Sequence, residues 1–134
     1  MRIVVDANVL VAALLSPHSP PAAILRLIVC DRVTVCCDAR ILDEYRTVIE
    51  RPTFAFDPRM ARELLAYLKA TGELINAPPL ALKLPDPDDA MFVEVAMAGR
   101  ADYLISGNLK HFPVRECRGV CLVSSREFIE QAAL

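Results

Sequence analysis

Short runs of apolar residues alternate with segments of helical periodicity along the sequence. Ile3–Val5, Val33–Cys37, Tyr103–Ile105 and Val120–Val123 are too short for helices and too continuously apolar for strands with one solvent-exposed face. Such runs are typical of strands in a parallel sheet that helices cover on both faces. Apolar residues make up 54% of the chain, which suits this arrangement. We therefore predict an α/β fold: a three-layer α/β/α sandwich with a mainly parallel central sheet of 4–5 strands, in a single domain over residues 1–134.

The segments between these strands show the apolar spacing of helices, and several begin with capping residues. The expected helices are Val9–Leu15, Ala22–Val29, Ala39–Ile49, Arg59–Ala70, Pro85–Met97 and Ser125–Ala132, and Leu74–Ile75 is a further weak strand. Asp38 and Asp86 stand at N-cap positions, and Pro87 suits the first helical position. Ser124 and Glu127 match a capping box, and Gly72 is expected to close a helix as its C-cap.

Composition argues against several classes of protein. No run approaches the roughly 18 to 20 uncharged apolar residues that cross a bilayer, and a signal-peptide pattern is absent from the sequence start, so we expect a cytoplasmic protein without a membrane partner. The five cysteines are accompanied by only two histidines at unhelpful spacings, which favours reduced, buried thiols over a zinc site or disulfides. The net charge of −2 does not resemble the basic surface of a conventional nucleic-acid binder.

Asp6 is the first candidate functional residue, because it directly follows a buried strand. The carboxyl ends of parallel strands are where α/β proteins build their ligand sites. A simpler explanation is that Asp6 or Asn8 only caps the helix that follows.

Other polar residues fall at positions that can face the same rim of the sheet. They are Glu44 inside the helix Ala39–Ile49, Asp86, Asp88 and Asp89 at a helix start, and Ser106 and Asn108 after a strand. Helix capping and the helix dipole also explain the three aspartates. Carboxylates within about 5 Å of each other repel by roughly 3 kcal/mol and need a cation or a raised pKa. Oxygen ligands without Cys or His select Mg²⁺ or Mn²⁺, which points to metal-assisted phosphodiester hydrolysis.

Four motifs, taken in order, resemble the PIN domain family. They are VVDANVL near the start, LDEY at Leu42–Tyr45, LPDPDDAMFVEVAMAGRADYLISGN at Leu84–Asn108, and HF at His111–Phe112. Within the family, the sequence is most similar to the VapC-like toxins of toxin–antitoxin pairs. This resemblance covers essentially the whole chain. It implies a Mg²⁺- or Mn²⁺-dependent endoribonuclease, often homodimeric, that acts on RNA, leaves a 5′-phosphate and is inhibited by a small antitoxin protein.

The resemblance also assigns roles by position. It implies Asp6, Glu44 and Asp89 as metal-binding catalytic acids, with Asp88 as the substitute if the alignment shifts by one residue. Ser106 matches a family Ser or Thr, and Asn8 resembles the residue that steadies the first turn. Asn108 departs from the family, because the fourth acid commonly stands there. Its carbonyl oxygen can still bind a metal ion, but one negative charge is lost.

Two alternatives remain open. Asn108 motivates the hypothesis of a catalytically weak or inactive PIN module that binds RNA or a partner protein. A receiver-like or phosphatase-like domain with Asp6 as phosphoryl acceptor is disfavoured, since no Asp-x-Asp motif follows the first strand and no suitable Lys follows a late strand. Four cations are candidate contacts to substrate phosphate, although solvated surface charges explain each more simply: Arg40, Arg46, Lys110 and His111.

Overall fold

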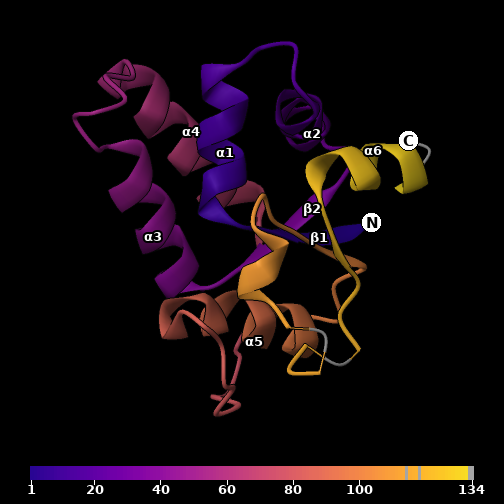
Figure 1. Cartoon of the computed structure of the whole chain (residues 1–134). Helices are drawn as coiled ribbons and strands as arrows, with labels where there is room; N and C mark the ends of the chain where they lie inside the picture. Colours follow the sequence, from indigo (N-terminus) through magenta and orange to yellow (C-terminus); the bar gives the residue numbers. More distant parts are fainter. Residues whose placement is uncertain (114, 118, 133–134) are drawn as a thin grey trace.

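The computed structural model describes residues 1–113, 115–117 and 119–132, and a parallel sheet lies at its centre (Figure 1). Its strands are β1 (Arg2–Val5), β2 (Thr34–Cys37), β3 (Glu73–Leu74), β4 (Tyr103–Ile105) and β5 (Leu122–Val123). Their order is β3-β2-β1-β4-β5, and every neighbouring pair is parallel. The chain order reverses between β1 and β4, which is the point at which open α/β sheets form ligand crevices.

Helices lie on both faces of the sheet. The described helices are α1 (Ala7–Leu15), α2 (Pro20–Val29), α3 (Ala39–Ile49), α4 (Pro58–Thr71), α5 (Ala90–Ala98) and α6 (Ser125–Ala132), with short 3₁₀ helices η1 (Pro87–Asp89) and η2 (Leu109–His111). Helix α5 packs against β1, β2 and β4 from one face, while α1, α2 and α6 lie on the opposite face (Figure 1). The predicted three-layer α/β/α fold is therefore confirmed.

Strand β1 carries the centre of the core. Ile3, Val4 and Val5 are completely buried, which is why their sequence shows no apolar–polar alternation. The buried hydroxyl of Tyr45, on α3, donates a hydrogen bond to the Val5 carbonyl. Burial raises the pKa of Tyr45 well above its ordinary value, so the hydroxyl keeps its proton as a donor. This hydrogen bond holds α3 beside the carboxyl end of β1, which Asp6 directly follows.

Most element predictions agree with the structure, because their local signals agree with the tertiary packing. Helix α3 begins and ends at the predicted residues, and the Asp38 carboxylate caps it by accepting from the Ile41 N–H at 3.0 Å. The capping box forms in both directions between Ser124 and Glu127. The helix predicted over Pro85–Met97 differs: it starts as the 3₁₀ helix η1, and the α-helix begins only at Ala90.

Gly72 ends α4 for a reason other than the one predicted. Its φ of −68° lies outside the left-handed region that glycine C-caps use. A Cβ atom at this position would lie 2.5 Å from the Leu68 carbonyl oxygen and 3.1 Å from the Val35 carbonyl oxygen. Glycine is therefore needed here for the close approach of α4 to β2.

All five cysteines are free thiols, as predicted, but their burial is not uniform. Cys36, Cys37 and Cys117 are buried, whereas Cys30 and Cys121 are exposed. The prediction of buried thiols is therefore wrong for these two, because Cys30 follows the end of α2 and Cys121 precedes β5, both at the surface.

Among the described residues, no single helix is long and apolar enough to span a membrane. Helices α1 and α2 have the length and composition only when taken together, and they are bent by 102° relative to each other.

Candidate active site

Asp6 directly follows β1, and its carboxylate is hydrogen-bonded to a residue far along the chain. It occupies the N-cap position of α1, but its side chain makes no capping hydrogen bond. Its Oδ2 atom instead accepts a hydrogen bond of 2.8 Å from Ser106 Oγ, which follows β4. Both side chains are buried, with 6% of Asp6 and none of Ser106 exposed. Helix capping is therefore not the role of the Asp6 side chain.

Ser106 connects Asp6 to the turn that contains Asn108. Its hydroxyl accepts a hydrogen bond of 3.0 Å from the Asn108 backbone N–H while donating to Asp6. The hydroxyl thus holds the β4–η2 turn and orients the Asp6 carboxylate with one buried group.

His111, in η2, continues this chain of hydrogen bonds to a second acid. Its Nδ1 lies 3.1 Å from Asp89 Oδ2, and its Nε2 lies 3.0 Å from Asn108 Nδ2. The assignment consistent with both contacts has Nδ1 donating to the carboxylate and Nε2 accepting from the Asn108 amide. Asp89 and Asp6 are thereby joined through His111, Asn108 and Ser106, in a chain of groups that come from two strand ends and two 3₁₀ helices.

Asp89 lines the same cleft as Asp6 and has a raised pKa. The Asp89 carboxyl occupies the N-cap position of α5 without capping it. Burial, followed by the charges of Asp6 and Asp86, raises the pKa of Asp89 to about 6, while the charge and hydrogen bond of His111 oppose the rise. A carboxyl whose pKa is raised by burial and by like charges is typical of sites that bind a cation.

These acids open into one cleft of about 250 Å³. Glu44 and Val48 of α3 form one wall of the cleft and lie on the same helix face because they are four residues apart, and Arg51, just after the end of α3, also lines the cleft. The other lining residues include Asp6, Asn8, Asp86, Asp88, Asp89 and His111. Asp6, Glu44, Asp88 and Asp89, the acids named from the sequence as metal ligands, therefore all line the same cleft.

The remaining predicted residues lie around this cleft in different roles. Ser106 and Asn108 support it from behind through the hydrogen bonds described above. Asp88 lines the cleft but is exposed, whereas Asp89 is partly buried and bonded to His111. Lys110 lies on the exposed side of η2 and is not among the lining residues. Arg51 was missed, since it stands just after α3 in a loop without a recognisable motif.

Arg40 and Arg46, two of the candidate phosphate contacts, are engaged in ion pairs. Arg40 contacts Asp38 and Glu94, each at 2.8 Å, and these hydrogen bonds raise its pKa. Glu94 is only 5% exposed and also accepts from the Leu80 backbone N–H. Arg46 pairs with Asp43 on the exposed face of α3. In this structure both guanidinium groups neutralise protein carboxylates.

Arg40→Ala is expected to lower the free energy of unfolding by about 2 kcal/mol, because it leaves the buried Glu94 carboxylate without its counter-charge. Arg46→Ala is the matched control: the side chains of Arg46 and Asp43 are 59% and 61% exposed, so we expect a loss below about 0.5 kcal/mol. Urea unfolding of both variants measures the difference. Equal losses would show that the Arg40–Glu94 ion pair contributes no more to the free energy of unfolding than the exposed Arg46–Asp43 pair.

His111→Leu is expected to raise the pKa of Asp89 further above its value of about 6, because the hydrogen bond and charge that lower it are removed. His111→Asn places an amide N–H near the position of Nδ1 and should retain much of the lowering. NMR titration of the Asp89 side-chain carbon in EDTA measures both. An unchanged pKa in His111→Leu would contradict the contact.

The donor chemistry of the cleft suits a hard divalent cation. Both ring nitrogens of His111 are hydrogen-bonded to protein groups, so neither nitrogen is free to bind a metal ion. The ligands that remain are the carboxylate oxygens of the acids, which Mg²⁺ and Mn²⁺ prefer. Within the described residues, no three Asp, Glu, His or Cys side chains are placed closely enough to hold an ion. Asp6 and Asp89 line the same cleft, and Glu44 would have to turn toward them to complete a site.

Several solved structures share this fold, including the following two. One is VapBC2 from Rickettsia felis bound to a DNA fragment from its promoter: 14% identity, TM-score 0.60, 92% of this chain and 98% of that chain covered. The other is FitAB bound to the IR36 DNA fragment, with 15% identity, a TM-score of 0.62, and coverage of 92% and 94% respectively. No curated protein sequence matches the chain at a significant level.

The sequence itself matches a family profile over most of its length. The match is to the PIN domain and spans residues 2–110, which contain all three predicted metal-binding acids as well as Ser106 and Asn108. PIN domains are generally nucleases that use divalent metal ions. This chain belongs to the PIN domain family.

Proposed function

We propose that this protein is a Mg²⁺- or Mn²⁺-dependent endoribonuclease of PIN type and the toxin of a type II toxin–antitoxin pair. The observation that carries the proposal is the arrangement of Asp6 and Asp89, two carboxyls that line one cleft with Glu44 and make no side-chain helix cap, where burial and the Asp6 charge raise the pKa of Asp89. A structural role would not require such unfavourable electrostatics.

In this proposal Asp6, Glu44 and Asp89 hold the metal, with Asp88 and Asn108 at its margin. A divalent ion bound there would polarise a phosphodiester oxygen and lower the pKa of a water molecule. Ser106 orients Asp6, and His111 orients both Asp89 and the Asn108 amide. Because the Asn108 Nδ2 group donates to His111, its carbonyl oxygen is the atom left for a ligand.

Arg51 is the cation of the cleft that we expect to contact the substrate phosphate. It lies just after the end of α3 and lines the same cleft as Glu44. A guanidinium group pairs well with phosphate oxygens. Hydrolysis would leave a 5′-phosphate on the product.

The test is cleavage of single-stranded RNA with Mn²⁺. The proposal expects cleavage that EDTA stops and that Asp6→Asn abolishes. Cleavage that survives both treatments would come from a contaminating nuclease or another mechanism, and would contradict the assignment.

An antitoxin partner, a homodimer and a cytoplasmic location belong to the same proposal. Two of the similar solved structures are VapBC2 and FitAB, each bound to DNA. The adjacent reading frame of the source genome is the first observation to make: a small protein encoded there should co-purify with this chain and inhibit cleavage. A chain that neither has such a neighbour nor is toxic on expression would not be an antitoxin-controlled toxin.

Asn108 favours a second candidate, a weakly active or inactive PIN module that binds RNA or a partner protein. The amide removes one negative charge from the site, and the described acids do not form a group of three around one point. Calorimetric titration with Mn²⁺ separates the two candidates. The nuclease should bind Mn²⁺ with millimolar or better affinity, and the inactive module should not.

A further inference from the structure

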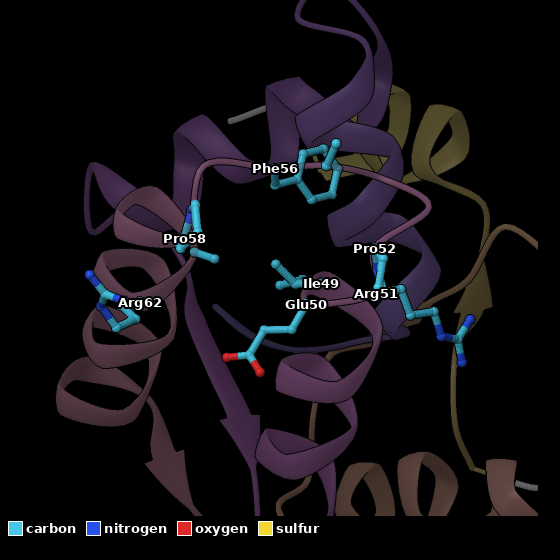
Figure 2. A pocket seen from close by; sticks show the side chains of 9 residues that line it. Ile49, Glu50, Arg51, Pro52, Phe56, Pro58 and Arg62 are labelled. Atoms are coloured by element: carbon cyan, nitrogen blue, oxygen red, sulfur yellow. The ribbon is translucent and has the colours of Figure 1, made fainter.

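A second cavity lies next to the acidic cleft, between the end of α3 and the start of α4 (Figure 2). Its volume of about 320 Å³ is in the range of small-ligand pockets. We call it the α3–α4 pocket and define it by Ile49, Glu50, Arg51, Phe56, Ala61 and Arg62. Ile49 and Ala61 are buried core residues, so the floor of the pocket is apolar and fixed.

The loop over this pocket is held in place by its own contacts. The Phe54 N–H donates to the Arg51 carbonyl at 3.1 Å, and the Ala55 N–H donates to the Pro52 carbonyl at 3.2 Å. The rings of Phe54 and Phe56 stack, with their centroids 5.5 Å apart and their planes at 14°. Phe56 is thus a positioned aromatic wall of the pocket.

Arg51 belongs to both cavities. It lines the α3–α4 pocket and also the acidic cleft that contains Asp6 and Asp89. In Figure 2 its guanidinium group points away from Arg62, which lies on the opposite side of the pocket. One extended ligand could therefore occupy the cleft and the pocket together and pass beside Arg51.

The charges of the α3–α4 pocket fit a nucleotide. Among the described residues, Arg51 and Arg62 make neither an ion pair nor a side-chain hydrogen bond, in contrast to Arg40 and Arg46. Two uncommitted guanidinium groups suit phosphates. The Glu50 carboxylate, which has acceptor oxygens only, suits the N–H groups of a base edge.

We propose that the α3–α4 pocket binds one base of single-stranded RNA. The phosphate next to this base lies in the acidic cleft, and Arg51, which lines both cavities, contacts that phosphate. This inference rests on the proposed ribonuclease function and specifies how the substrate is held. An aromatic wall, an apolar floor and flanking cations form the usual combination for a base and its backbone in single-strand recognition. A purely apolar protein side chain would leave both arginines without a partner.

The test is the binding of a short, fluorescein-labelled single-stranded RNA, followed by fluorescence anisotropy in EDTA so that no RNA is cut. Phe56→Ala should raise the Kd by about tenfold, the usual cost of losing one stacked base. Arg62→Gln, a change on the exposed face of α4, should raise the Kd by about threefold or more, since one phosphate contact is lost. Arg59→Gln is the matched control from the same helix outside the pocket, and its Kd should stay within about twofold of the unchanged protein.

An RNA of the same length without bases makes the test specific for stacking. It should bind the unchanged protein and Phe56→Ala with the same Kd. Equal Kd values for Phe56→Ala, Arg62→Gln and Arg59→Gln on normal RNA would overturn the inference. Loss of binding to a co-purifying protein, with RNA binding intact, would also overturn it and make the pocket a protein-docking site.

Failure of this inference is distinguishable from failure of the proposed function. RNA binding that depends on the pocket, without cleavage in Mn²⁺, would leave the pocket standing and remove the nuclease activity. Cleavage with KM unchanged in Phe56→Ala and Arg62→Gln would support the nuclease activity and overturn the proposed role of the pocket.

Discussion

Asp6→Asn is expected to lower the rate of RNA cleavage in Mn²⁺ by about 10³-fold or more, the consequence of losing several kcal/mol of transition-state stabilisation. The substitution removes one of the carboxylates that line the cleft. The amide introduced in place of the Asp6 carboxylate would still offer a carbonyl oxygen to the Ser106 hydroxyl, so the fold should be retained.

The control for this variant is Asp43→Asn, another acid-to-amide change. Asp43 precedes Glu44 on α3, but its side chain is 61% exposed and pairs with Arg46 outside the cleft. Its cleavage rate should stay within about twofold of the unchanged protein. Equal activity of both variants would show that the reaction does not depend on Asp6.

Asp89→Asn is expected to stabilise the metal-free protein at neutral pH. The folded-state pKa of Asp89 is raised from 3.8 to about 6, so the folded protein holds this proton more tightly than the unfolded chain does. Ionisation of Asp89 therefore destabilises the folded state progressively as the pH rises from about 4 to about 6, and the penalty is absent below about pH 4. We expect the variant to be about 1–2 kcal/mol more stable at pH 7, which is less than the full shift because the site is near solvent and the carboxyl also bonds to His111.

Thermal unfolding in EDTA measures this gain as a rise in Tm of about 2–6 °C at pH 7 that disappears near pH 4. Mn²⁺ should reverse the order, because it stabilises the folded protein through Asp89 and has less effect on the variant. A variant less stable than the parent at pH 7 in EDTA would mean that the Asp89 charge is well compensated and not strained.

Elements with strong local signals were predictable from the sequence. The three apolar residues of β1, the Asp38 cap of α3 and the Ser124–Glu127 box each act within a few residues, so spacing alone identifies them. Strand β3 gave only a weak signal, because Leu74 is 64% exposed at the edge of the sheet.

The roles of individual polar residues were harder to predict. Asp6, Asp38 and Asp89 all occupy N-cap positions, and only Asp38 caps with its side chain. The difference lies in partners far along the chain: Ser106 is 100 residues from Asp6, and His111 is 22 residues from Asp89.

Arg40 shows the same limit in a different way. Its partner Glu94 is 54 residues away, on a helix whose other buried residues are apolar. No local sequence pattern therefore predicts this ion pair. The sequence suggests His111 as a phosphate contact, whereas in the structure its ring bonds to Asp89 and Asn108. Asn108 was recognised as a departure from the family, but its hydrogen bond to His111 depends on the fold of η2.

The most direct test of the central claim is anomalous diffraction from crystals soaked in Mn²⁺. The account predicts a single strong peak in the acidic cleft, about 2.1 Å from carboxylate oxygens of Asp6 and Asp89, with Glu44 turned toward it. No peak at millimolar Mn²⁺, or a peak bound only by residues outside the cleft, would contradict it.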